Sequence, residues 1–327
     1  MNATYLKYKE QVSIRPNAPF HFDSTIFKPA HFPSNDTKWE SGKRWQTFVW
    51  RDEKLGLILK NKGTVEKPGL LLEVYSEKKL PGEFIKGVVD EVKWRFNLDL
   101  DLKGFYESAQ NDDLLKPIIR KFYGMRPMHH GNLYEYLVIS ILLQNATVRR
   151  SVNMMQALFE HYGAALEYDN QKLWCFWEPA ILAGVAEEEL RSLKVGYRAK
   201  SLLKISVTFA KSKIDEFALR KLENEDLETE LQKLYGVGPA STWIIMFEVF
   251  NRFDYLKHIS PWEQKIYTKL FFDKDYEKEL VPTKDLIEYF DKRWGGWKNL
   301  AVNYVWEDLF WRRRNEPVEW LEKLIRL

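Results

Sequence analysis

The 327-residue sequence contains one cysteine, Cys175, and six histidines. A single cysteine excludes disulfides within the chain, a four-cysteine iron–sulfur cluster and a cysteine-rich zinc site. The histidines lack the spacing of metal ligands, and the adjacent His129 and His130 are more typical of a polar loop than of a ligand pair. We therefore expect neither a cofactor nor a catalytic metal.

Long apolar runs are also missing. The longest uncharged apolar-rich stretch, residues 136–148 (YLVISILLQNATV), is too short to span a bilayer and predicts a buried helix. The opening MNATYLKYKEQ has no cationic segment followed by an apolar run, so no signal peptide is predicted. We expect an intracellular protein without a membrane partner.

An excess of charge of one sign is also missing, because the chain has 50 Lys and Arg and 47 Asp and Glu, for a net charge of +3. Any polyanion must then be bound by a local patch, since the distribution of charge rather than its total steers a ligand. Aromatic residues, in contrast, are abundant at 15% of the chain. They indicate either a core of large side chains or stacking platforms for flat ligands.

Two kinds of sequence follow each other along the chain. Short runs rich in Val, Leu and aromatics predict strands at 44–50, 54–61 and 69–76, and a helix follows at 81–96 with Val88 on its apolar face. From about residue 111, amphipathic segments predict one helix after another, at 133–144, 151–163, 199–211, 240–250 and 303–314. The prediction is an α+β fold, with an N-terminal antiparallel β-sheet domain with helices (1–110) followed by an all-α domain (111–327).

The segment LYGVGPAS, residues 234–241, is a turn that opens directly into a helix. Gly236 and Gly238 permit backbone angles and close approaches that a Cβ would forbid, and Pro239 suits the first turn of a helix. Exposed amide groups at such a helix start form an anion site, and we expect the turn from Leu234 through Val237 to Gly238 to hold a phosphate group. The alternative is an ordinary corner between two helices.

The neighbours of this turn extend the pattern. Residues 193–205 (LKVGYRAKSLLKI) precede it, and residues 258–270 (HISPWEQKIYTKL) begin another helix about 25 residues after the glycines. This order of helix, hairpin, helix, loop, Pro-x-acid and helix resembles the helix-hairpin-helix DNA glycosylases with a Gly/Pro-rich loop and a carboxylate. That superfamily includes the alkyladenine and 8-oxoguanine glycosylases.

The resemblance covers most of the chain. Residues 21–33 (HFDSTIFKPAHFP) are similar to the opening strand of the family's N-terminal domain, although KPA stands where Ser-Gly-Gln is common, and residues 98–107 resemble the link between the domains. Residues 138–151 (VISILLQNATVRRS) resemble the first helix and minor-groove loop of the helical core. Residues 297–306 (WKNLAVNYVW) match a late helix that carries an aromatic residue into the base pocket. The resemblance implies that the helical part is a glycosylase core.

The residue at the family's catalytic aspartate position is Glu263, in Ser260-Pro261-Trp262-Glu263. A carboxylate there would stabilise the positive charge that develops on the sugar as the base leaves. Ser-x-x-Glu is also a capping box, which would give Glu263 a structural role, and the two roles are compatible. We expect the helix N-terminus to lower the pKa of this carboxyl and to keep it ionised.

Ala240 stands where members of the superfamily with lyase activity carry a lysine, so the resemblance implies a hydrolase without lyase activity. Trp306 matches the pocket aromatic, and Trp243, Trp262 and Ala240 are further candidates for the base pocket.

By resemblance, Gln144 and Asn145 would fill the space that a flipped base leaves; the alternative for both is a helix C-cap. The predicted function is removal of alkylated purines of the 3-methyladenine type from damaged double-stranded DNA, by a monomer, to leave an abasic site. An 8-oxoguanine glycosylase and a non-catalytic protein that binds damaged DNA are the alternatives.

Overall fold

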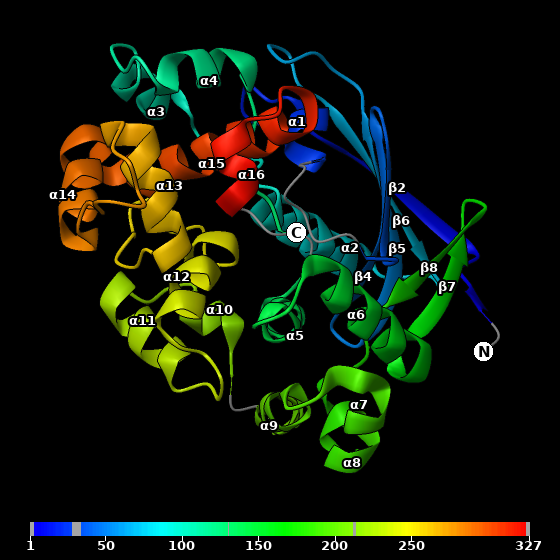
Figure 1. The fold of residues 1–327 in the computed structure, drawn as a ribbon. Coiled ribbons are helices and arrows are strands. Elements are labelled where there is room, and N and C mark those ends of the chain that lie inside the picture. Colours follow the sequence, from blue (N-terminus) through cyan, green and yellow to red (C-terminus); the bar gives the residue numbers. More distant parts are fainter. Residues whose placement is uncertain (1–2, 28–33, 130, 212–213, 325–327) are drawn as a thin grey trace. The chain divides into compact units, whose positions relative to one another are not determined.

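The structure, a computed structural model, describes residues 3–27, 34–129, 131–211 and 214–324 (Figure 1). It has two compact units that interleave along the chain. The first is formed by Met1–Asp101 and Tyr123–Glu216, and the second by Leu102–Phe122 and Phe217–Leu327. The α+β class with an N-terminal antiparallel sheet is confirmed. The division into consecutive domains, 1–110 and 111–327, stays a prediction.

A five-stranded antiparallel sheet is the centre of the first unit. Its strand order is β2 (Tyr8–Ile14), β6 (Leu70–Ser76), β5 (Glu53–Asn61), β4 (Lys43–Trp50) and β3 (Thr37–Glu40). Side chains alternate between its faces, so Leu57 and Leu59 of β5 enter one core cluster while Ile58 enters another.

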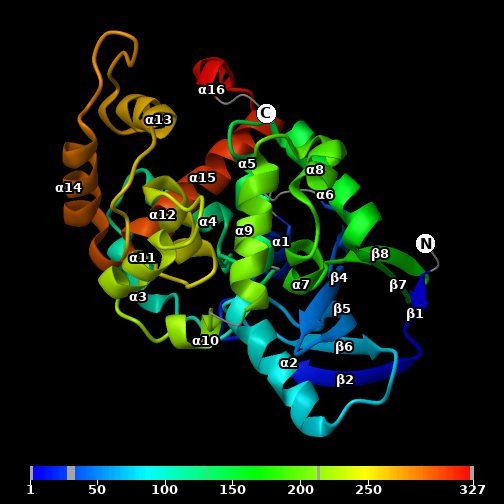
Figure 2. The ribbon, with the colours of Figure 1, turned by 90° about the horizontal axis from the view of Figure 1, so that it is seen from below.

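Each face of the sheet is covered. Helix α2 (Gly82–Arg95) lies along one face (Figure 2). Its Val88 and Val92 enter the core cluster there, as the predicted apolar stripe requires. A second, three-stranded sheet covers the other face with Tyr168. At Gly56 of β5 a Cβ would lie 2.6 Å from the Tyr168 ring, so this close approach requires glycine.

The second sheet is a feature that the sequence analysis missed. It consists of β1 (Thr4–Tyr5), which runs parallel to β7 (Ala164–Tyr168), and β8 (Gln171–Cys175), which is antiparallel to β7. Asp169 and Asn170 link β7 and β8 with φ values of 48° and 58°. Two consecutive residues with positive φ form a type I′ hairpin turn, so this dipeptide was the local signal for strands within the helical stretch.

The predicted strand at 21–33 is wrong where the structure describes it, because Phe22–Ile26 forms the short helix α1. The imidazole Nδ1 of His21 accepts the amide of Ser24 at 3.1 Å and caps this helix. Asp23 accepts the amide of Gly42 at 2.8 Å. The KPA segment, 28–30, lies outside the described residues.

The remaining elements are helices, and the five helices predicted after residue 111 are present with ends shifted by a few residues. In the first unit they are α5 (Leu133–Leu143), α6 (Val148–Tyr162), α7 (Pro179–Ala183), α8 (Glu187–Leu190), the π-helical turn η1 (Arg191–Val195) and α9 (Arg198–Ala210); α10 (Glu216–Leu219) spans the boundary. In the second unit they are α3 (Lys103–Ser108), α4 (Leu115–Lys121), α11 (Asn224–Gln232), α12 (Pro239–Glu248), α13 (Pro261–Phe272), α14 (Thr283–Trp294), the 3₁₀ turn η2 (Gly295–Trp297), α15 (Lys298–Asn315) and α16 (Glu319–Leu324). None of the described helices is both long and apolar enough to cross a membrane.

Buried aromatic packing and one ion pair hold α13 and α14 to the rest of the second unit. Tyr267 and Phe290 meet edge to face, with ring centroids 5.4 Å apart. Asp112, in the loop before α4, accepts Arg293 Nη2 at 2.7 Å and Trp294 Nε1 at 2.8 Å. The segment 102–122 is thereby fixed against α14.

Candidate functional site

The glycine turn lies between α11 and α12 in the second unit. Gly236 has a φ of 83°, which favours glycine, and Gly238 is the N-cap of α12 with Pro239 at the first helical position. Leu234 and Val237 are buried, at 5% and 8% exposure, and fix the turn from inside. Only the backbone of these two residues can therefore serve a ligand, while the first turn of α12 presents amides without a partner in their own helix.

Gly238 differs from Gly236 in a way that matters for function. Its φ of −104° is ordinary for any residue, and a Cβ added there would meet no atom within 4 Å. The described residues thus give no packing or conformational reason for glycine at this position. A group from outside the chain that approaches the backbone closely would give one.

Glu263 lies in the first turn of α13, where Ser260 is the N-cap and Pro261 the first helical residue. The carboxylate Oε2 accepts the Ser260 amide at 2.8 Å and the Ser260 hydroxyl at 2.6 Å, and the full capping box is present. The side chain is only 5% exposed. Burial raises the pKa of Glu263 above its ordinary 4.5, although the hydrogen bonds from Ser260 and Tyr267 lower it. The expected lowering by the helix N-terminus is therefore wrong in direction, because desolvation is the larger effect.

A buried tyrosine of α13 is bonded to Trp306. The indole Nε1–H of Trp306 donates to the Tyr267 hydroxyl at 2.8 Å. Tyr267 also lowers the pKa of Glu263. Tyr267 is 1% exposed, and burial raises its pKa well above 10.0. It stands four residues after Glu263 on the same helical face, a spacing that could have pointed to it from the sequence.

The predicted pocket residues divide into two groups. Trp262 and Trp306 lie together, with ring centroids 5.0 Å apart, beside Glu263. Trp243 is half-buried on α12 and stacks on no aromatic ring among the described residues. Ala240 is exposed in the first turn of α12. The structure thus brings Trp262, Glu263 and Trp306 into one cluster and leaves Trp243 outside it.

The two lysines nearest to Glu263 in the sequence have other partners. Lys257 Nζ lies 3.1 Å from Glu225, and Lys265 Nζ lies 3.5 Å from Glu277. Both pairs are surface contacts, so neither amine is arranged as a partner of the Glu263 carboxylate.

The loop between α5 and α6 belongs to the first unit and carries Gln144 and Asn145. Gln144 is the C-cap of α5, as the alternative interpretation expects, and its carbonyl accepts the guanidinium of Arg198 and the hydroxyl of Tyr197. Asn145 is exposed, has a φ of 49°, and donates its amide to Tyr197 at 3.3 Å. Tyr197 and Arg198, which sequence reasoning missed, therefore support this loop from the start of α9.

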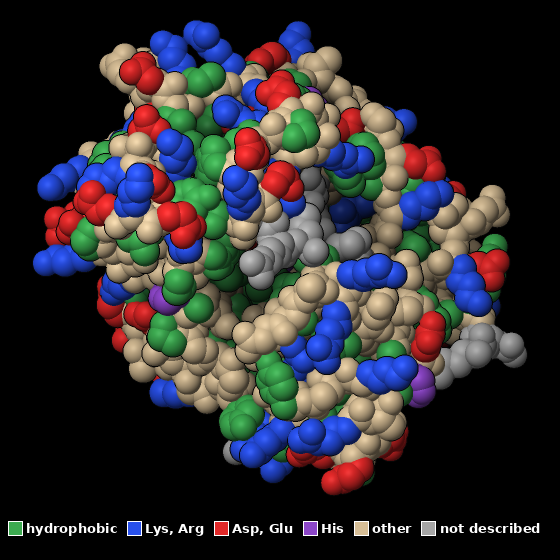
Figure 3. Space-filling view, in the orientation of Figure 1, with side chains coloured by type: hydrophobic (Ala, Val, Ile, Leu, Met, Phe, Trp, Pro, Cys, Tyr) green, Lys and Arg blue, Asp and Glu red, His purple; other side chains and the backbone are tan. Residues whose placement is uncertain are grey.

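The start of α6 carries two exposed arginines in its first turn, Arg149 and Arg150. Cations are electrostatically unfavourable at a helix N-terminus, so the helix dipole gives no reason for arginine at these two positions. Elsewhere, basic and acidic side chains are interspersed over the face in Figure 3, as a net charge of +3 suggests. Among the described residues, no group of three or more His, Cys, Asp or Glu could hold a metal ion.

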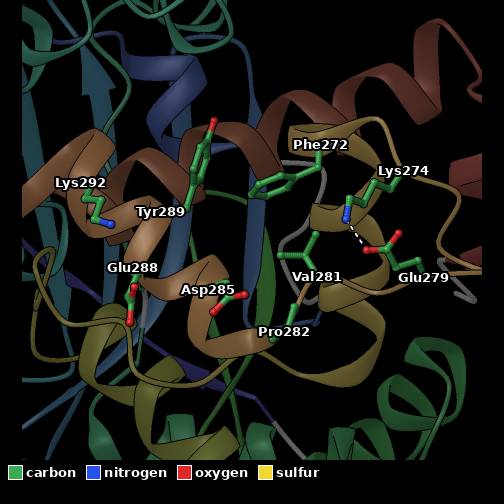
Figure 4. Close-up of a pocket in the computed structure, with 9 residues that line it drawn as sticks. All are labelled: Phe272, Lys274, Glu279, Val281, Pro282, Asp285, Glu288, Tyr289 and Lys292. Carbon is green, nitrogen blue, oxygen red and sulfur yellow. Dashed lines mark hydrogen bonds and ion pairs between the residues drawn. The ribbon is translucent and has the colours of Figure 1, made fainter.

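A separate cavity of about 460 Å³ lies between the end of α13 and α14 (Figure 4). Phe272 and Tyr289 form an aromatic pair at its wall, with centroids 5.0 Å apart, and Lys274 is paired there with Glu279. None of the residues predicted for the base or for DNA lines it. It is distinct from the cluster around Glu263.

No protein-family model matches the chain. The chain is 26% identical to the DNA-3-methyladenine glycosylase of Bacillus subtilis (strain 168) over a matched segment of 216 residues. This segment covers 66% of this chain and 70% of the relative. The solved 3-methyladenine DNA glycosylase of Archaeoglobus fulgidus matches at a TM-score of 0.72 and 15% identity, over 94% of this chain and 100% of that one. The 8-oxoguanine glycosylase/lyase of Clostridium acetobutylicum, in its apo form, matches at a TM-score of 0.68 and 19% identity, over 94% and 99%. These structures share the fold of the chain.

Proposed function

Because the chain belongs to the helix-hairpin-helix superfamily of DNA glycosylases, we propose that it is a monofunctional enzyme that removes alkylated purines of the 3-methyladenine type from double-stranded DNA. The observation that carries the proposal is the buried Glu263 at the start of α13, beside Trp262 and Trp306. The product is DNA with an abasic site. A DNA substrate implies action inside the cell, and a single lesion requires only a monomer.

The chemistry follows from the residues of this cluster. A flipped purine would stack on the exposed indole of Trp262, which packs against the buried Trp306, and an alkylated, cationic purine gains additionally from the electron-rich ring face. As the bond to the base breaks, the ionised Glu263 would stabilise the positive charge on the sugar. Water would then complete the hydrolysis.

The turn of residues 234–238 and the loop at Gln144 and Asn145 would serve the DNA rather than the base. The amides at the start of α12 would hold a backbone phosphate, and Asn145 would fill the space that the flipped base leaves. The absence of a lysine at Ala240 supports hydrolysis without strand cleavage. It also disfavours a glycosylase/lyase acting on 8-oxoguanine.

The test is a single-turnover excision assay on duplexes that contain 3-methyladenine, hypoxanthine or 8-oxoguanine, each with and without alkali. We expect cleavage of the alkylated duplex only after alkali treatment. Glu263→Gln should lower the rate by a factor of about 10² to 10³, as loss of a charge-stabilising group does. Glu230→Gln, at a partly exposed glutamate of α11 that pairs with Lys233, is the matched control and should behave as wild type.

Each other outcome contradicts one part of the proposal. Strand cleavage without alkali would show that an amine is the nucleophile. Excision of 8-oxoguanine alone would overturn the substrate class. Tight binding to an abasic-site analogue with no excision of any lesion would indicate a non-catalytic DNA-binding protein.

A further inference from the structure

We propose that Ser260 is a positioning residue for the reaction, because its hydroxyl and its amide hold one oxygen of the Glu263 carboxylate in place while the bond to the base breaks. The inference rests on the proposed function, in which Glu263 stabilises the charge that develops on the sugar. Ser260 would touch neither the base nor the sugar, and it would act only through Glu263.

Two hydrogen bonds carry the inference, and both end on the same carboxylate oxygen. The Ser260 hydroxyl donates to Oε2 of Glu263 at 2.6 Å, and the Ser260 amide donates to the same oxygen at 2.8 Å. Glu263 is only 5% exposed, so little water competes with these donors. Hydrogen bonds to an ionised acceptor are about twice as strong as those between neutral groups. Ser260 therefore fixes the carboxylate through Oε2, and Oε1 takes no part in these two bonds.

A second capping box shows that a helix start does not require the hydroxyl bond. At the start of α5, Asn132 is the N-cap and Glu135 the third helical residue. The Asn132 amide donates to Glu135 Oε2 at 2.8 Å, and the Asn132 side-chain oxygen accepts the Glu135 amide at 2.9 Å. Between these two described residues, the glutamate side chain accepts a backbone amide alone. The bond from the Ser260 hydroxyl to Glu263 is therefore an addition to the capping box, and it acts on the carboxylate.

The length of the Glu263 side chain makes such a hold useful. A glutamate has one more rotatable bond than the aspartate usual at this position, so its carboxylate can occupy more positions. A shift of about 1 Å in a catalytic group can cost a factor of about 10² in rate. The two donors of Ser260 remove this additional freedom, because they fix Oε2 against the start of the helix.

The experiment separates helix capping from the hold on the carboxylate, in the full chain. Ser260→Gly removes the hydroxyl but keeps a good N-cap, because glycine replaces serine there with little loss of stability. Ser260→Thr keeps both the cap and the hydroxyl. Asn132→Gly makes the same kind of change in the box of α5 and is the matched control. We expect single-turnover excision of the alkylated duplex to fall by about 10- to 100-fold in Ser260→Gly, and to stay within about threefold of wild type in the other two variants.

The pH profile distinguishes positioning from a purely structural role. Loss of the Ser260 hydroxyl disfavours the ionised carboxylate, so the acidic limb should move to higher pH in Ser260→Gly but not in Ser260→Thr or Asn132→Gly. Among the described residues, Tyr267 is the other group that lowers the pKa of Glu263, and no charged side chain of α14, α15 or α16 contributes. Ser260→Cys offers a weaker donor of similar size and should move the limb in the same direction by less. This variant tests the inference where Ser260→Gly does not fold.

Failure of the inference and failure of the proposed function give different results. An unchanged rate and profile in Ser260→Gly, with Glu263→Gln inactive, would overturn the positioning role and leave the glycosylase intact. Equal losses in Ser260→Gly and Ser260→Thr would also overturn it, because the threonine keeps the hydroxyl. If the wild type excises no lesion, the proposed function fails.

The hold on the carboxylate is then tested without a substrate. The titration of the Glu263 carboxyl is followed by ¹³C NMR and assigned by its loss in Glu263→Gln. An unchanged titration in Ser260→Gly would overturn the inference. A shift to higher pH that is absent in Ser260→Thr would support it.

Discussion

Trp262 and Trp306 form an inclined pair, with ring centroids 5.0 Å apart and planes at 52°. Trp306 is 9% exposed and bonded to Tyr267, whereas Trp262 is 43% exposed. One indole of the pair is therefore built into the core and the other stands at the surface beside Glu263. The roles of the two rings can be tested separately by mutation, because substitution of the exposed Trp262 should leave the core intact.

We expect Trp262→Ala to slow excision of the alkylated purine by about 10-fold, since stacking of a base on an aromatic ring contributes about 1–3 kcal/mol. Stability should change little, because the side chain is half exposed. Single-turnover rates and thermal unfolding measure the two effects. Trp243→Ala is the comparison, and it should leave the excision rate unchanged because Trp243 lies outside the aromatic cluster. Equal losses in both variants would contradict the assignment of the pocket.

The two glycines of the turn should respond differently to alanine. Gly236→Ala should destabilise the protein by about 1 kcal/mol, because its φ of 83° strains a residue with a Cβ. Gly238→Ala should fold as wild type, because its backbone is ordinary and the added Cβ meets open space. If Gly238 marks the close approach of a phosphate, Gly238→Ala should nevertheless bind duplex DNA more weakly. Urea unfolding and DNA affinity are measured on both variants. An unchanged DNA affinity in Gly238→Ala would contradict the binding of a phosphate at this turn.

The exposed Arg149 and Arg150 give a prediction about salt. If they bind phosphates, the double change to alanine should weaken binding to damaged and undamaged duplexes alike. The slope of log affinity against log salt should fall by about 2, close to one for each arginine that neutralises a phosphate. Stability should not fall, because cations at the start of α6 oppose the helix dipole. An unchanged salt dependence would show that Arg149 and Arg150 do not bind DNA phosphates.

Local signals predicted much of this structure because they act within one element. The stripe that includes Val88 and Val92 located α2, and Gly238-Pro239 located the start of α12 within one residue. The hairpin of β7 and β8 was missed because its two strands are short and each is stabilised by the sheet that it covers.

The same contrast holds at the site. The capping pattern of Ser260 and Glu263 can be read along the chain, but the pKa direction of Glu263 cannot, because burial depends on α15 and its Trp306. The hydrogen bond between Tyr267 and Trp306 was missed for this reason, since it joins α13 to α15.

Asp112 and Arg293 provide a prediction about acid stability. Burial alone would raise the pKa of Asp112, but hydrogen bonds from Arg293, Leu115 and Trp294 hold this pKa below its ordinary 3.8. A carboxyl whose pKa is lower in the folded state stabilises the fold at pH values above its unfolded-state pKa. This stabilisation is lost as the pH falls through the folded-state pKa. Asp112→Asn should therefore cost about 2 kcal/mol in the free energy of unfolding at neutral pH, as loss of a charged hydrogen bond does. The difference from wild type should shrink below about pH 4. A difference independent of pH would show that shape rather than charge matters at this position.

Glu263→Asp installs the residue that the family usually carries, yet we expect it to be slower than wild type. The shorter side chain withdraws the carboxylate by roughly one bond length, about 1.5 Å, from donors that are set for glutamate, and such misplacement costs a factor of about 10 to 10² in rate. Its acidic limb should also move to lower pH, because an aspartate is the stronger acid and is ionised over a wider range. Once Ser260→Ala has removed the hydroxyl that donates to Glu263, the aspartate change should cost less than it does alone. Single-turnover rates of the two single variants and the double variant measure this coupling, and strictly multiplicative losses would mean that the Ser260 hydroxyl and the length of residue 263 act independently.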